Sequence, residues 1–213
     1  MKRAVEYRGI ARDNLRNNWG NAIIVCLITF SVSTLLGFVP VIGTIGSILL
    51  AGPLMVAEII YFVKLHKNED ATINSMFVDF GKNLINNFLT YILQTLFIIL
   101  WSLLFIVPGI IKSYSYAMTM YLKAKRPELE ANEAITMSRQ IMDGKKWKLS
   151  CLQFSFIGWI ILSIITLGIG LIFLLPYMQA SITAFYEDAY NEYQQKINSD
   201  DNAENEIIVE ENN

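Results

Sequence analysis

The sequence contains little of what soluble enzymes use for chemistry. Its 213 residues include one histidine, two cysteines and five prolines, and only 17% are charged, against about 25% in soluble domains. The lone histidine, His66, argues against a metal site, and Cys26 and Cys151 are interpreted as structural thiols. Motifs of phosphate-binding loops, serine hydrolases, zinc proteases and thiol oxidoreductases are also missing. We therefore expect no catalysis, no cofactor, no metal and no nucleic-acid partner.

Long uncharged runs are what the sequence has in abundance. Residues 17–57 and 149–186 carry no charge at all. The second run would rise roughly 57 Å as one helix, whereas a bilayer core is about 30 Å thick. A small-residue turn at 167–170 divides it, which predicts two membrane crossings joined tightly. The first run is too long for a cleaved signal peptide, so we expect an uncleaved anchor.

The same plan of two crossings and a short turn occurs three times. The predicted fold is an all-α, polytopic membrane helix bundle, with six transmembrane helices arranged as three hairpins. Turns fall at Pro40, Pro108 and Gly168, since proline and glycine interrupt helices. The predicted spans are residues 21–36, 44–63, 84–107, 110–124, 149–166 and 171–188.

Short amphipathic helices are predicted before each hairpin. Residues 2–18 suit either a helix on the membrane surface or only a positive anchor for the first span. A second short helix presents an apolar face, and the third is bounded by Pro127 and Gly144. The face of the second comprises Ile73, Met76, Phe77 and Phe80. That of the third comprises Ala131, Ala134, Ile135, Ser138, Ile141 and Met142.

Positive charge is distributed very unevenly. Sixteen of the 17 Lys and Arg residues lie in the N-terminal segment, the two long connections or the C-terminal tail, and Lys112 is the exception. The positive-inside rule then predicts a multi-pass protein of the bacterial cytoplasmic membrane with both termini in the cytoplasm. Anionic lipid headgroups at the inner face are the expected partners. Candidate headgroup contacts are Arg12, Arg16, Trp19, Lys145, Lys146 and Trp147.

An internal repeat is a further hypothesis. Residues 1–190 would form one transmembrane domain of three units, about 1–64, 65–126 and 127–190. The alternative is that any six-span chain with short outer turns looks periodic. The acidic remainder, residues 191–213, is predicted to be a disordered cytoplasmic tail.

One carboxylate falls inside a predicted span. Glu58 could bind a proton, a cation or a lipid headgroup, because ionisable residues in membranes are often functional. Alternatively it pairs with Lys64 or Lys123, or stays a neutral, hydrogen-bonded acid. Span 4 is rich in hydroxyls that would either pack between helices or line a cavity. The candidate intramembrane polar site is Glu58, Tyr114, Tyr116 and Thr119.

Other polar residues near the span ends are expected to meet solvent or headgroups. Lys112 should extend to the outer headgroups. Glu187, Asp188 and Tyr190 should be solvated at the inner interface.

Several motifs resemble a known family. They are LRNNWGNAI from Leu15, PELEANEAITMSRQIMDGKKW from Pro127, FSFIGW at 154–159, TLGIG at 166–170 and PYMQASITAFYED at 176–188. In this order they are similar to the bacterial membrane family catalogued as domain of unknown function 975, over residues 1–190. The resemblance implies an uncharacterised integral membrane protein, chiefly of Gram-positive bacteria, and brings no catalytic residues.

These observations favour a non-enzymatic membrane protein that interacts with lipids, with partner membrane proteins or with itself. The competing interpretation is a small-solute or lipid transporter or channel with a cavity near Glu58. An enzyme acting on lipids is a third and weaker interpretation.

Overall fold

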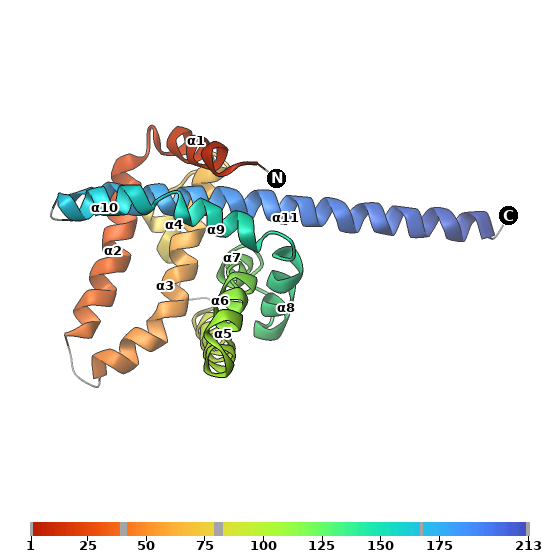
Figure 1. Ribbon diagram of the computed structural model, residues 1–213, viewed down its shortest axis with the longest axis horizontal. Coiled ribbons are helices and arrows are strands. Elements are labelled where there is room, and N and C mark those ends of the chain that lie inside the picture. The colour runs from red at the N-terminus through yellow and green to blue at the C-terminus, as the bar shows by residue number, and fades with distance from the viewer. Residues whose placement is uncertain (1, 39–41, 79–82, 167, 212–213) are drawn as a thin grey trace.

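The computed structural model describes residues 2–38, 42–78, 83–166 and 168–211, and every regular element in those ranges is a helix (Figure 1). The all-α prediction is thus confirmed for the described residues. Pro40 and Phe80, at a predicted turn and on a predicted apolar face, lie outside them. The helices are α1 (Ala4–Leu15), α2 (Trp19–Gly37), α3 (Ile42–His66), α4 (Ile73–Val78), α5 (Leu84–Leu104), α6 (Ile106–Ser115), α7 (Thr119–Lys125), α8 (Ala131–Ile141), α9 (Lys146–Phe154), α10 (Ile157–Ile165) and α11 (Ile169–Glu211).

Five segments are long and apolar enough to cross a bilayer, and they correspond to five of the six predicted spans. Large apolar side chains stay exposed along them, including Phe30, Leu96 and Ile165. Apolar surface of this extent is typical of a protein surrounded by lipid. The five segments are Trp19–Leu36, Ile45–His66, Leu84–Leu104, Lys146–Ile165 and Ile169–Ser199.

The fourth predicted span, residues 110–124, is not one membrane-crossing helix. Phe105, in extended conformation, makes the turn between α5 and α6. Pro108 lies in the first turn of α6 instead of at the tip of the hairpin. Proline fits there because its missing amide is one that a helix start leaves unpaired. A second break follows Ser115, and the next helix, α7, is buried almost completely.

Side chains from neighbouring helices satisfy the backbone at the break between α6 and α7. The Ser138 hydroxyl of α8 accepts a hydrogen bond from the Met118 amide at 3.2 Å and donates one to the Ser115 carbonyl at 2.9 Å. Gln94 of α5 donates to the Tyr116 carbonyl at 3.1 Å. Non-helical backbone at membrane depth is tolerated only where protein or a water-filled cavity replaces the lost partners. The break is therefore built into the packing.

The three hairpins point in different directions. In Figure 1, α2 and α3 run alongside each other, α10 and α11 lie across them, and α5 and α6 are seen nearly end-on. Within each hairpin the two arms pack together. A bend between α9 and α10 after Phe154 further interrupts the fifth predicted span. The predicted bundle of six spans in three matching hairpins is thus confirmed only as an all-helical fold with five apolar spans.

The predicted short helices form as α1, α4 and α8, and α1 and α8 bury one face. α1 buries Tyr7, Ala11 and Leu15 and packs against α11, so it is more than a charged anchor. α8 begins with reciprocal capping between Glu130 and Glu133. The buried residues of α8 and its cap, Ala134, Ile135, Ser138, Ile141 and Met142, all belong to the predicted face.

The order of short helix, outgoing helix and returning helix occurs three times along the chain. The second and third hairpins also share a contact beside the turn. Gly109 in α6 packs onto Ser102, and Gly170 in α11 packs onto Ser163, which lies seven positions earlier in both cases. Each serine hydroxyl donates to the carbonyl four residues before it. This match favours the internal repeat. The repeat and the boundaries of its three units stay predictions.

The acidic segment predicted to be disordered is helical up to Glu211, as the long end of α11 in Figure 1 shows. Starting a helix is the costly step, and extending an existing one is not. Beyond Pro176 the sequence offers neither proline nor glycine to end α11. The helix that precedes the tail thus continues into it, although the composition of the tail alone favours disorder.

Candidate functional site

Glu58 lies on α3, 9% exposed, beside a cavity of about 230 Å³ between α2, α3 and α11. The Cys26 thiol of α2 donates to its carboxylate at 3.6 Å, and the side chains of Thr29 and Gln179 line the same cavity. Two helices, α2 and α11, therefore bring polar groups to the buried acid on α3. Of the alternatives that the sequence leaves open for Glu58, the arrangement fits a hydrogen-bonded acid better than an ion pair.

The other members of the predicted polar site lie elsewhere. The Tyr114 hydroxyl donates to Gln153 of α9 at 2.9 Å, and the Tyr116 carbonyl accepts from Thr119 at 2.8 Å as part of the break after α6. The expected site with Glu58 is therefore not assembled. The Tyr114 hydroxyl is instead directed to α9, and the Thr119 hydroxyl is used within the break itself.

Lys123 does not pair with Glu58 either. Its ammonium is buried and donates to two backbone carbonyls, those of Pro127 at 2.9 Å and Leu129 at 2.6 Å. Lys123 thus fixes the loop that leads into α8. Among the described residues, no ion pair involves Glu58 or Lys64.

A buried ion pair that the sequence analysis missed joins α7 to α11. The Lys125 ammonium contacts the Glu187 carboxylate at 2.7 Å and the Tyr121 hydroxyl at 3.0 Å, and it lies 4.1 Å from the centre of the Tyr190 ring. The expectation that Glu187 is solvated is wrong, since it is only 4% exposed. In the sequence, the only indication of this ion pair is that carboxylates follow directly after a long apolar run.

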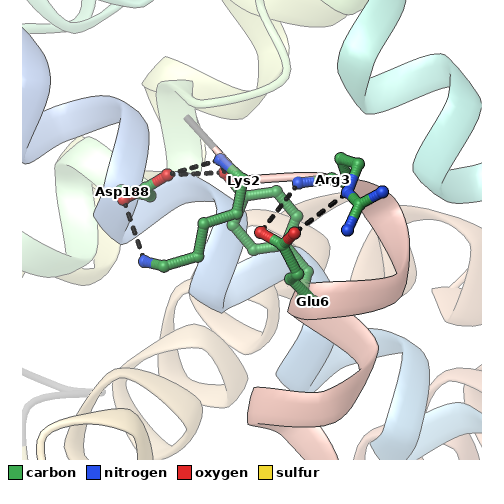
Figure 2. A network of polar contacts seen from close by, with 5 residues as sticks. Lys2, Arg3, Glu6 and Asp188 are labelled. Atoms are coloured by element: carbon green, nitrogen blue, oxygen red, sulfur yellow. Dashed lines mark hydrogen bonds and ion pairs between the residues drawn. The ribbon is translucent and has the colours of Figure 1, made fainter.

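Asp188 anchors the start of the chain, as Figure 2 shows. The Tyr7 hydroxyl donates to its carboxylate at 2.6 Å, and the Lys2 ammonium lies 3.3 Å away. Arg3 and Glu6 form an exposed pair at 3.0 Å that caps α1. Burial, together with the bond to Asp188, raises the pKa of the Tyr7 phenol. The phenol is therefore a persistent donor that holds α1 on α11.

An apolar groove of about 350 Å³ lies between the α10–α11 hairpin and the start of the chain. Arg12 and Trp19 line it together, and the Trp19 ring lies 6.4 Å from that of Phe173. The remaining lining residues are Trp159, Leu162, Ser163, Thr166, Gly170, Leu174 and Tyr177.

The candidate headgroup contacts fall into separate places. Arg16 is exposed outside the groove, and Lys145 pairs with Glu192 at 3.6 Å. Trp147 is 73% exposed. Lys146 lines a different, basic cavity.

The groove also bears on topology. Thr166 and Gly170, at a turn predicted to lie outside, line it beside Arg12, which is predicted to lie inside. Because the hairpins lie across one another, a residue predicted outside and a residue predicted inside line the same groove.

Nothing in the described ranges gathers three His, Cys, Asp or Glu side chains into a possible metal site. The single histidine, His66, instead contacts Asn14 through Nδ1 at 3.1 Å. That contact ties α1 to the end of α3.

The fold and these sites are those of an all-helical protein whose apolar spans suggest a membrane protein. A family model described as "Protein of unknown function (DUF975)" matches residues 1–115 and 103–192, so the chain belongs to that family, as the resemblance indicated. No curated protein matches the chain, and no solved structure does.

Proposed function

We propose that this chain is a non-enzymatic integral protein of the bacterial cytoplasmic membrane that binds an anionic lipid. An acyl chain would lie in the groove between the α10–α11 hairpin and the start of the chain, and the headgroup would contact Arg12. A partner membrane protein or a second copy is the competing occupant of this surface.

The groove is the observation that supports this proposal. Two of its three hydroxyl groups, those other than the Tyr177 phenol, are engaged within the hairpin, because Ser163 donates to the Trp159 carbonyl at 2.8 Å and Thr166 to the Ser163 carbonyl at 3.0 Å. What remains facing the space is mainly aromatic and aliphatic. Such a surface matches a hydrocarbon chain rather than a polar solute.

Charge at the edge of the groove fits an anionic headgroup. Arg12 makes no ion pair among the described residues, and Trp19 beside it is the residue type found at membrane interfaces. A basic residue near an anionic membrane surface contributes about 1 kcal/mol. Arg12 therefore supplies the polar end that an apolar groove lacks.

Native mass spectrometry of the full chain in mild detergent, supplied with phosphatidylglycerol, tests the proposal. Arg12→Gln should weaken retention of one lipid about fivefold, the equivalent of about 1 kcal/mol. Leu162→Trp should do so by filling the groove. Arg16→Gln, directly after the same helix but outside the groove, is the matched control. No stoichiometric lipid, or equal retention in all variants, would refute lipid binding here.

A second candidate, transport, is favoured by the Glu58 cavity alone. Ser33 and Thr29 line it with the buried carboxylate, which suits a proton or a small cation. Ion flux into liposomes containing the protein should fall with Glu58→Gln and persist with Glu69→Gln, an exposed acid. Absence of flux in the unaltered protein would leave Glu58 as a packing residue.

Placement of both termini in the cytoplasm belongs to the proposal and is supported by the charge distribution. Single cysteines placed at Ser199 and Phe38, in a chain lacking Cys26 and Cys151, would test it, because Phe38 is 79% exposed directly after α2, at the end of that helix away from Arg12. The proposal expects an impermeant reagent to label position 38 in intact cells and position 199 only after permeabilisation.

A further inference from the structure

A second cavity, of about 360 Å³, lies where α6 meets α8 and gathers three cations. Lys112 comes from α6, Arg139 from α8 and Lys146 from the start of α9. The other lining residues are Ser115, Thr136, Gln140 and Asp143. From the sequence, Lys112 is expected at the outer headgroups and the other two cations at the inner face, so the structure brings together groups that were expected apart.

The positive charges are not neutralised within the protein. Asp143 is the one acid in the lining, and it lies 4.0 Å from Lys146. Lys112 rests over the Trp101 ring at 4.5 Å, and Arg139 forms no ion pair in the part of the chain that the structure describes. Like charges held around one cavity repel one another. A bound anion would remove that repulsion.

The neutral side chains add donors rather than acceptors. The Gln140 carbonyl oxygen already accepts from the Tyr193 hydroxyl at 2.7 Å, which leaves the amide NH₂ group free to donate. The Thr136 hydroxyl is a further available donor. An arginine fork with lysine ammonium groups and neutral donors suits the several oxygens of a phosphate better than a carboxylate or a chloride ion.

The position of the cavity matches that of a lipid headgroup. The outward side of α6 is apolar, with Ile106, Ile110 and Ile111 exposed, whereas α8 is largely polar outside its buried face. The cavity therefore lies at the border between apolar and polar surface, where lysine and arginine side chains reach headgroups.

We propose that Lys112, Arg139 and Lys146 form a binding site for a phosphate ester, carried by an anionic lipid or by a soluble compound. The site is separate from the groove at Arg12, so either can be wrong without the other.

The full chain in phosphatidylcholine nanodiscs allows both sources to be tested. Phosphatidylglycerol is incorporated in one series and glycerol 3-phosphate is added in the other, with binding read by native mass spectrometry. Arg139→Gln and Lys146→Gln should each weaken the relevant interaction about fivefold. Lys148→Gln, an exposed cation outside the cavity, is the matched control, and Arg12→Gln should leave this site unchanged.

The outcomes separate cleanly. If Arg139→Gln and Lys146→Gln weaken the binding of phosphatidylglycerol alone, the site is assigned to a lipid. If they weaken the binding of glycerol 3-phosphate, the site is assigned to a soluble phosphate ester. If each probe binds Arg139→Gln and Lys146→Gln as tightly as it binds the unaltered chain, the site does not exist. The same conclusion follows if Lys148→Gln weakens binding as much as Arg139→Gln and Lys146→Gln do. Melting temperatures of the variants establish that each is folded.

Discussion

The Lys125 ammonium lies 2.7 Å from the Glu187 carboxylate, and their side chains are only 17% and 5% exposed. The pair fixes the short α7 to the long α11 in the protein interior. A buried pair of this kind adds little net stability over an apolar pair, but removing one partner leaves a charge without compensation.

Glu187→Gln or Lys125→Met should therefore destabilise the protein by about 3 kcal/mol, measured by unfolding in mixed micelles. The double variant should recover part of this loss, because no lone charge remains. Lys67→Met, from an exposed pair with Glu69 at 3.9 Å, should cost well under about 1 kcal/mol. A single change at Lys125 that costs no more than Lys67→Met would contradict the role assigned to the buried pair.

Ser138→Ala tests the break between α6 and α7. The change removes a partner from both the Met118 amide and the Ser115 carbonyl, and unsatisfied buried groups cost about 1–3 kcal/mol each. We expect faster hydrogen exchange confined to residues 115–120. Ser199→Ala, which removes a local bond at an exposed position of α11, is the control. Unchanged exchange at Met118 would show that the hydroxyl is dispensable.

Tyr7→Phe should loosen α1 from α11 by about 1.5 kcal/mol, since the lost hydrogen bond ends on a carboxylate. Proteolysis within the first 16 residues is the measurement, and Tyr193→Phe, on an exposed bond, is the control.

The same bond predicts a pH dependence. The pKa of Tyr7 is raised, so its contribution is complete below the ordinary tyrosine value of about 10 and is lost as pH rises further. Attachment of α1 should be constant between pH 6 and 9. Loosening within that range would contradict the role given to the phenol.

The apolar spans and the helical class could be predicted because they depend on local composition. Uncharged runs longer than the bilayer is thick leave few alternatives. The faces of α8 followed in the same way from helical periodicity, and Gly144, in a left-handed conformation at φ 68°, follows that helix as expected. Family membership could be predicted because several separate motifs occur along the chain in the order typical of the family.

The direction of the hairpins could not be predicted, because it depends on pairs distant in the sequence. Gln94 and Ser138 stabilise a break that span 4 alone does not announce. The different hydrogen-bond partners of Glu58 and Thr119 could not be predicted for the same reason. Counting basic residues likewise assigns sides only if every hairpin crosses the membrane, and hairpins lying across one another need not do so.

The crossing of α3 and α5 gives the last prediction. Gly52 packs so closely on Asn87 that a Cβ atom would lie 2.5 Å from the Asn87 carbonyl oxygen and 2.7 Å from the Tyr91 Cβ. One of these atoms is in the backbone and the other is a Cβ, so neither can move away by a change of side-chain rotamer. Gly52→Ala should force the helices apart and destabilise the protein by about 1–3 kcal/mol.

Gly158 in α10 provides a matched comparison, because nothing lies within 4 Å of where its Cβ would be. Gly158→Ala should be neutral or stabilising by about 0.4–1 kcal/mol, as the unfolded chain loses freedom at no steric cost. Unfolding midpoints of the two variants in mixed micelles therefore move in opposite directions if α3 and α5 cross at Gly52. Equal stability of the two alanine variants would mean that the helices do not approach closely there.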